Sequence, residues 1–367
     1  MEQIEHKDHF HGSDLEKIEK VYGIPKEQIT SFSANVNPLG ISYALREKLA
    51  AHLDVISSYP DRDYTSLRKA IASYAGTKPE RVIVGNGSTE LISLAIQIKH
   101  PKKALILGPT YSEYERDIAL CGGRSRYFPL REEDDFELNL SALSAQITED
   151  IDLLIICNPN NPTSSQITSD TMRHILDICL VKGVFVLVDE TYVEFAEEMA
   201  KVTSVPLTGS YNNLLVLRGV SKFYAAPGLR LGYGICGNPD LLGEIAQRKD
   251  PWSVSSLAAL AGEIMFSDHE YIEKTRHLIR DERTRILDIL RGFTGCKIYP
   301  SSANFLLVRI LKEGVTAQML FEACIKKGLM IRNCATFPFL DESYIRFCFM
   351  SPEKNDELLA ILKEYLA

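Results

Sequence analysis

The chain has 367 residues, of which 45% are hydrophobic and 25% charged, proportions that are ordinary for a globular protein with a full core. Its formal net charge of −8 argues against nucleic acid or an anionic membrane as a partner, but leaves room for a small anion in a local cationic pocket. The eight cysteines form no C-x-x-C pair, and neither a signal peptide nor an apolar run of membrane-spanning length is present, so we expect a cytoplasmic protein with buried free thiols.

The first forty residues contain a histidine-rich start, a short helix and an extended segment. His6, His9 and His11 lie close together, but their spacing fits no standard metal pattern, and we predict no metal site. Helical periodicity follows over residues 14–22. The extended segment ends in a turn, and Asn35 lies just before that turn, where its amide can face a ligand.

A glycine turn between a strand and a helix forms the first candidate anion site. Tyr59 lies in a loop before a helix predicted over 64–75, and an ordinary aromatic role at the helix start is open to it. The strand that follows ends at Gly87-Ser88-Thr89, where a new helix begins. Backbone N–H groups at a helix start, beside hydroxyls, suit a phosphate. A Rossmann site is not predicted, because the third glycine of its motif is missing.

The next two predicted strands end in loops rich in polar residues. The strand at 104–107 leads to Tyr111, whose ring either stacks on a flat ligand or packs in the core. The strongly apolar strand at 151–157 runs into a loop of prolines and asparagines that contains Asn161. Ligand sites of α/β proteins form at such strand ends.

An aspartate ends the following strand. A helix at 170–181 precedes an apolar strand at 184–188, and Asp189 comes directly after it, with Tyr192 three residues further on. A carboxylate at the end of a buried strand is costly unless it has a partner. The protonated nitrogen of a pyridine ring is a partner that fits.

A lysine lies at the mouth of the apolar strand at 214–217. Ser221 and Lys222 follow this strand, and Arg230 lies eight residues beyond the lysine. An amine in an apolar pocket has a lowered pKa and attacks carbonyls, while hydroxyl and guanidinium groups anchor a phosphate. Together they indicate pyridoxal phosphate (PLP). Ser-Lys followed by Gly-Leu-Arg-x-Gly resembles the lysine signature of the fold-type-I, class I/II aminotransferase superfamily.

The order of the predicted elements indicates an α/β fold with two parts. Strands and helices alternate over 82–234, which predicts a mostly parallel, doubly wound sheet. Beyond Trp252 a long helical stretch at 255–290 is followed by short strands at 305–308, 329–332 and 344–349. We expect a large PLP-binding domain of residues 41–255, and an N-terminal arm and smaller α+β domain formed by residues 1–40 and 256–367.

The resemblance implies a role for each residue of the cofactor site. The residue matching Lys222 carries PLP covalently, and the one matching Asp189 pairs with the ring nitrogen. The residues matching Asn161 and Tyr192 contact the 3′-oxygen, and the one matching Tyr111 stacks on the ring face. The phosphate is held by residues that match Arg230, Ser221 and Gly87-Ser88-Thr89. The residue resembling Tyr59 comes from the neighbouring subunit, which implies a homodimer. One departure is visible: Ser164 replaces the glycine that usually follows Asn-Pro-Thr.

Two arginines in strand-like settings suggest an anionic substrate. Arg332 and Arg346 lie among apolar residues, where a guanidinium is costly unless it meets an anion. Either one of them pairs with a protein carboxylate, or both face the cleft. In the second case the substrate carries two anionic groups, or one doubly charged group.

Motifs along nearly the entire chain narrow the resemblance to threonine-phosphate decarboxylases of cobalamin biosynthesis, more closely than to histidinol-phosphate aminotransferases. They include the segments 32–40, 59–61, 85–87, 221–224, 227–233, 251–254 and 332–335. The resemblance implies that the phosphorylated amino acid is held by His11, Gly12, Asn35, Asn161, Arg332 and Arg346. The predicted reaction is decarboxylation of O-phospho-L-threonine or O-phospho-L-serine. Transamination by a histidinol-phosphate or other aminotransferase is the alternative, since it uses the same cradle. A PLP-binding regulatory module is disfavoured because no DNA-binding segment is evident.

Overall fold

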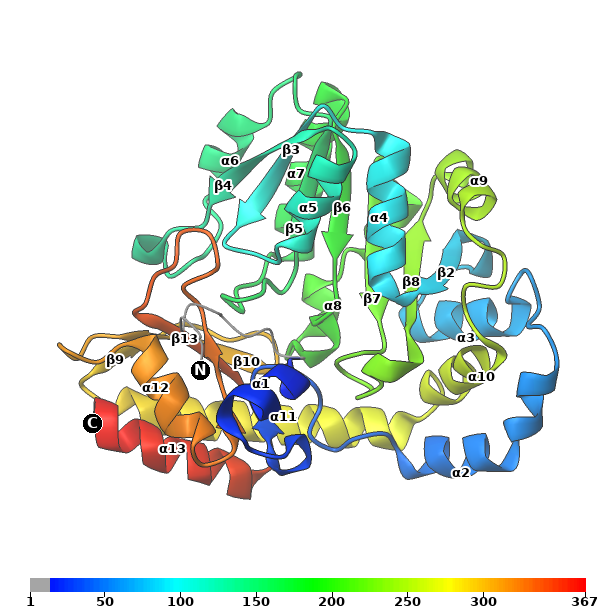
Figure 1. The fold of residues 1–367 in the computed structure, drawn as a ribbon. Helices are drawn as coiled ribbons and strands as arrows, with labels where there is room; N and C mark the ends of the chain where they lie inside the picture. The colour runs from blue at the N-terminus through cyan, green and yellow to red at the C-terminus, as the bar shows by residue number, and fades with distance from the viewer. Residues whose placement is uncertain (1–13) are drawn as a thin grey trace.

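The computed structural model describes residues 14–367, and its largest sheet has seven strands in the order β2-β8-β7-β6-β5-β3-β4 (Figure 1). β8 runs antiparallel to both of its neighbours, and the other strand pairs are parallel. The strands are β2 (Val82–Asn86), β3 (Lys103–Gly108), β4 (Arg124–Pro129), β5 (Leu153–Cys157), β6 (Phe185–Asp189), β7 (Leu214–Gly219) and β8 (Leu231–Cys236). This arrangement confirms the predicted α/β class with a mostly parallel sheet.

Helices cover both faces of this sheet, which explains why its central strands read as continuous apolar runs. Ile106 packs with the helices of one face, and its neighbour Leu105 packs on the other face. The helices of the first face are α4 (Gly87–Lys99), α5 (Glu113–Leu120) and α9 (Pro239–Arg248). Those of the second face are α3 (Thr65–Ala75), α6 (Leu140–Gln146), α7 (Ser169–Lys182) and α10 (Ser256–Met265). Two further helices are α2 (Tyr43–Ala51) and α8 (Met199–Val202).

The C-terminal third forms a smaller layer that the N-terminal segment joins. Its four-stranded antiparallel sheet has the order β12 (Arg332–Asn333), β13 (Tyr344–Cys348), β10 (Phe305–Ile310) and β9 (Cys296–Ile298). Its helices are α11 (His269–Arg291), α12 (Ala317–Ile325) and α13 (Pro352–Leu366), and α1 (Leu15–Tyr22) lies beside them in Figure 1. β1 (Thr30–Ser31) pairs in parallel with β11 (Leu329–Met330). This pairing places the N-terminal segment next to the C-terminal part of the chain. The domain boundaries at residues 41 and 255 stay a prediction.

Two predicted elements differ from those in the structure. The helical stretch predicted over 255–290 is two helices, because the chain turns between Met265 and His269, where the Asp268 side chain caps the second helix by accepting from the Tyr271 amide. The strand predicted over 329–332 is divided between two sheets, with β11 pairing with β1 and β12 pairing with β13. Each piece is only two residues long, and its partner lies far away in the sequence.

The cysteines and helices of the described region bear on the remaining expectations. The eight cysteines are free thiols, and six of them are buried. Within residues 14–367, none of the helices is sufficiently long and apolar to cross a lipid bilayer. The same part of the chain contains no group of three or more histidine, cysteine or acidic side chains arranged to hold a metal ion.

Candidate functional site

Lys222 lies in the turn after β7, beneath the N-terminal extended segment. All six residues of β7 are buried, and the lysine is half-buried two residues beyond the next buried side chain, Val220. Its Nζ donates a hydrogen bond to the Ala34 carbonyl at 2.7 Å. Burial, together with the positive charges of Arg346 and Arg230, lowers the pKa of the Lys222 ammonium from 10.5 to about 8. A substantial fraction of this amine is therefore neutral and nucleophilic near neutral pH.

Asp189 ends β6, and three donors fix its carboxylate. The Tyr114 hydroxyl donates to Oδ2 at 2.7 Å, while the Thr191 amide and hydroxyl donate to Oδ1 at 2.9 and 2.5 Å. The side chain is buried, and it lines the same cavity as Lys222. A fixed buried carboxylate of this kind is suited to hold a cationic ring nitrogen.

The start of α4 and Arg230 form a seat for an anion. Gly87 has φ +77°, and a Cβ at this position would lie 2.4 Å from Arg230 Nη2, so the guanidinium packs directly on the glycine backbone. Gly232 is equally constrained, since its Cβ would lie 2.2 Å from the Ser88 amide nitrogen. Ser88 and Thr89 occupy the first turn of a 13-residue helix, where backbone N–H groups and hydroxyls attract phosphate.

Arg332 and Arg346 face each other across two strands. They are direct partners in the antiparallel register of β12 and β13, which brings like charges together. Arg346 donates to Asn161 Oδ1 and to the Ser33 carbonyl, the latter at 2.7 Å, and Arg332 donates to Thr336 Oγ1 at 2.8 Å. Burial and the charge of Arg346 lower the pKa of Arg332 to about 10. An anion bound between the two guanidinium groups would offset both their burial and their repulsion.

A cavity of about 790 Å³ brings most of the predicted site residues together. The predicted residues that line it are Asn35, Ser88, Thr89, Tyr111, Asn161, Asp189, Tyr192, Ser221, Lys222, Arg230, Arg332 and Arg346. Asn35 Nδ2 donates to the Tyr192 hydroxyl at 3.4 Å, so the N-terminal segment contacts the loop after β6 directly. Both arginines line this cavity.

Two of the predicted site residues within the described region, Gly87 and Tyr59, do not line the cavity. Gly87 lies behind Arg230, with which it is in contact. Tyr59 is 82% exposed, and its ring lies 5.1 Å from that of Trp252, outside the cavity of its own chain. His11 and Gly12 lie outside the described residues.

Several cavity residues were not predicted from the sequence. Thr191 and Tyr114 hold Asp189, and Thr110, Thr336 and Phe337 line the wall. Tyr114 follows the predicted ring-stacking residue Tyr111 by three positions in the same strand-to-helix loop and first helical turn, and this spacing is the only sequence signal for it. Thr336 and Phe337 gave no signal, because their loop is brought to the cavity by the fold of the small sheet.

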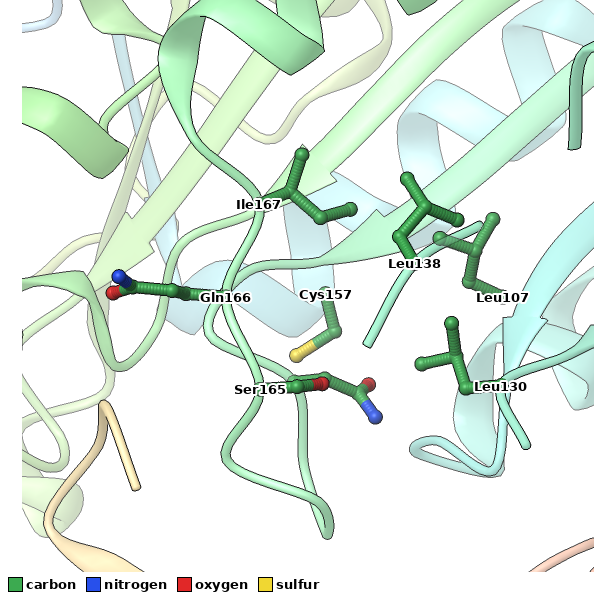
Figure 2. A pocket seen from close by; sticks show the side chains of 8 residues that line it. Leu107, Leu130, Leu138, Cys157, Ser165, Gln166 and Ile167 are labelled. Carbon is green, nitrogen blue, oxygen red and sulfur yellow. The ribbon is translucent and has the colours of Figure 1, made fainter. Parts of the chain in front are cut away.

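A second, much smaller pocket lies beside the loop that follows β5, and Ser165, Gln166 and Ile167 of this loop line it (Figure 2). It measures about 10 Å³, near the lower limit for a single water molecule, and four of its eight lining residues are aliphatic. Cys157 lines both this pocket and the large cavity. Because the large cavity has room for a ligand and is lined by most of the predicted site residues, it is the candidate active site.

Comparisons with known proteins agree with this geometry. Residues 27–362 match the profile of the family described as aminotransferase class I and II. The chain belongs to this family. It is 35% identical to the threonine-phosphate decarboxylase of Salmonella typhimurium, over 97% of this chain and 96% of that protein.

Solved structures of the family share the same fold. The histidinol-phosphate aminotransferase of Clostridium acetobutylicum superposes with a TM-score of 0.85 at 31% identity, over 91% of this chain and 98% of that one. The L-threonine-O-3-phosphate decarboxylase of Porphyromonas gingivalis superposes with a TM-score of 0.79 at 26% identity, with the same two coverages. The resemblance to the aminotransferase superfamily drawn from the sequence is confirmed, and so is the nearness to both groups of relatives.

Proposed function

We propose that the protein is a PLP-dependent carboxy-lyase that converts O-phospho-L-threonine, or O-phospho-L-serine, into an aminoalkyl phosphate for cobalamin biosynthesis. The observation that carries this proposal is the opposed pair of Arg332 and Arg346 in the cavity that also contains the Lys222 amine. The pair provides two cationic groups for a substrate with two anionic groups, a carboxylate and a phosphate. The 35% identity to a threonine-phosphate decarboxylase over nearly the full chain supports the same substrate.

The side chains of the cavity fit PLP, a flat aldehyde with a ring nitrogen and a phosphate. Lys222 offers the amine for the aldehyde, Asp189 the carboxylate for the ring nitrogen, and the start of α4 with Arg230 the phosphate seat. When bound, PLP supplies an electron sink next to the substrate Cα. The remaining proposed contacts are Asn161 and Tyr192 at the 3′-oxygen, Tyr111 on the ring face, and Ser88, Thr89 and Ser221 at the phosphate.

The chain's own residues orient the substrate and handle its proton. Either Arg332 or Arg346 binds the carboxylate and the other binds the phosphate, with Asn35, Asn161, His11 and Gly12 completing the substrate site. Arg346 is anchored to Asn161 and to the Ser33 carbonyl, so it presents its guanidinium in one direction. The Lys222 amine, whose pKa is about 8, can hold a proton and return it to the substrate Cα.

Transamination is the second candidate function. The similarity to the histidinol-phosphate aminotransferase structure favours it, and the two reactions use the same lysine, aspartate and arginines. They differ in which bond of Cα is set for cleavage, and a modest reorientation of the substrate changes that bond.

Incubation of the purified, PLP-loaded protein with O-phospho-L-threonine separates the two functions. Release of carbon dioxide without 2-oxoglutarate supports decarboxylation. A reaction that needs a keto acid and accumulates pyridoxamine phosphate would refute it and support transamination. O-phospho-L-serine should be tested in parallel, because the one methyl group that distinguishes the two substrates changes the free energy of transition-state binding by only about 1–3 kcal/mol.

The proposed assembly is a cytoplasmic homodimer with shared active sites. Tyr59 and Trp252 form an exposed aromatic pair, and Tyr43 and Ile56 nearby in the chain are also exposed. Their exposure supports a contact that would bring Tyr59 to the partner's cofactor. Buried free thiols support a reducing compartment.

A further inference from the structure

Ser164 occupies a backbone position that favours glycine. Its φ is +61°, in the left-handed region, and the residue is fully buried. In the resembling superfamily the residue after Asn-Pro-Thr is usually glycine. A side chain in this conformation is strained, so its presence calls for an interaction that the hydroxyl makes.

The Ser164 hydroxyl connects the loop that follows β5 to the segment that leads into β10. Its Oγ accepts hydrogen bonds from the backbone N–H groups of Ser302 and Ala303, at 3.0 and 2.8 Å. The Ser301 hydroxyl lies 3.1 Å away and donates in turn to the Phe305 carbonyl at 2.7 Å. Because Ser164 Oγ accepts two backbone donors, its own proton is directed to Ser301.

The segment held in this way supports three residues of the cavity, two from the proposed substrate site and one from the proposed cofactor site. The Phe305 ring lies 5.3 Å from the Arg346 guanidinium carbon and packs edge-on against Tyr192 at 5.0 Å. Asn304 Nδ2 donates to the Asn35 carbonyl at 3.0 Å. Phe305 thus braces Arg346 and Tyr192, and Asn304 braces Asn35.

The other end of the connection lies three residues before Ser164. Asn161 accepts a hydrogen bond from Arg346 Nη1. The contacts therefore form a closed circuit from Asn161 along the loop to Ser164, across to Ser301 and Phe305, and through Arg346 back to Asn161.

We propose that the Ser164 hydroxyl is a positioning group that holds Asn161 and Arg346 in the geometry needed to bind the anionic substrate. The choice of O-phospho-L-threonine as the test substrate rests on the proposed function. The circuit of contacts does not depend on that function. Removing the hydroxyl takes away its bonds to Ser301, Ser302 and Ala303 and leaves the backbone bond from the Ser302 N–H to the Ser164 carbonyl at 3.0 Å. Lys222, Asp189 and the phosphate seat stay intact. Substrate binding is then weakened, while the cofactor stays attached through Lys222, Asp189 and the phosphate seat.

Two substitutions separate positioning from backbone strain. Ser164→Ala removes the hydroxyl and keeps the strain, whereas Ser164→Gly removes both. Ser165→Ala is the matched control, because the Ser165 hydroxyl contacts Thr163 within the loop and not the 301–303 segment. Should the alanine variant fail to fold, the glycine variant still tests the proposal, since glycine readily adopts this backbone conformation.

The measurement is steady-state kinetics of the PLP-loaded protein with O-phospho-L-threonine, beside the absorbance spectrum of the bound cofactor. Both Ser164 variants are expected to raise KM about three- to tenfold, the change that corresponds to losing a buried hydrogen bond, with kcat and the spectrum nearly unchanged. Ser165→Ala should keep the wild-type KM. A wild-type KM in Ser164→Gly would overturn the proposal, because the side chain would then contribute only strain.

Amide hydrogen exchange tests the circuit independently of the substrate. If the wild-type protein does not act on O-phospho-L-threonine, the proposed function fails, and the exchange of the 301–305 segment still decides about Ser164. Faster exchange there in both Ser164 variants, and not in Ser165→Ala, supports the connection. Unchanged exchange in both variants would overturn it.

Discussion

The lowered pKa of Lys222 predicts the pH at which the apoprotein captures PLP. A pKa of about 8 leaves about one quarter of the amine neutral at pH 7.5, against about one part in a thousand for a lysine of pKa 10.5. Covalent capture requires the neutral amine, and at pH 7.5 this form is about two hundred times more abundant than in an ordinary lysine, so capture should be faster. The fraction of neutral amine, and with it the capture rate, rises with pH and is half-maximal near pH 8.

Removing the positive charge of Arg346 should move this midpoint. Arg346 stabilises the neutral form of Lys222, so Arg346→Gln raises the lysine pKa and shifts the half-maximal pH upward. Arg309→Gln is the control, because Arg309 lies on the same small sheet and forms its salt bridge with Glu132 at 3.2 Å. The assay is stopped-flow absorbance after mixing apoprotein with PLP between pH 6 and pH 10.5. A wild-type midpoint above about pH 10, typical of an unperturbed lysine, would refute the reasoning.

Four substitutions test the site and its surroundings. Arg332→Gln and Arg346→Gln should each raise KM for O-phospho-L-threonine about ten- to a hundredfold, since a hydrogen bond to a charged group contributes about 1.5–3 kcal/mol; steady-state kinetics showing a wild-type KM would contradict this. Asp189→Asn should retain the absorbance of lysine-bound cofactor but lower kcat about 10²–10³-fold, and full activity would exclude the proposed contact with the ring nitrogen. Glu194 is buried, which raises its pKa from 4.5 to about 7. Its protonated form therefore contributes about 3 kcal/mol to the free energy of unfolding, fully present below pH 4.5 and lost as the pH rises through 7. Denaturant midpoints at pH 5 and pH 8 should therefore converge in Glu194→Gln, and an unchanged difference would place the titration elsewhere.

The residues that could be predicted from the sequence are those whose setting is local. Asp189 and Lys222 each follow an apolar strand, and the edge of a parallel sheet collects such residues into one site. The Gly87 turn is likewise readable from a strand, a glycine and the start of a helix. These local patterns were sufficient to predict that Asp189 and Lys222 lie at one cavity.

The rest depends on contacts that join distant parts of the chain. β8 was not predicted because Gly232 and Gly234 interrupt its apolar pattern, although Gly232 is needed where the strand touches the start of α4. The opposition of Arg332 and Arg346 follows from a strand register, which neither strand encodes by itself. The sequence shows Ser164 only as the replacement for a glycine, and its bonds to Ser302 and Ala303 become visible only when the two segments are placed side by side.

Reduction with borohydride followed by peptide mass analysis tests the central claim most directly. The reagent converts the bond between PLP and an amine into a stable secondary amine, so the attachment point survives digestion. The account predicts that the added mass is found on Lys222, and that Lys222→Ala lacks both this mass and the absorbance of lysine-bound cofactor. Labelling of a different lysine, or an unchanged absorbance in Lys222→Ala, would contradict it.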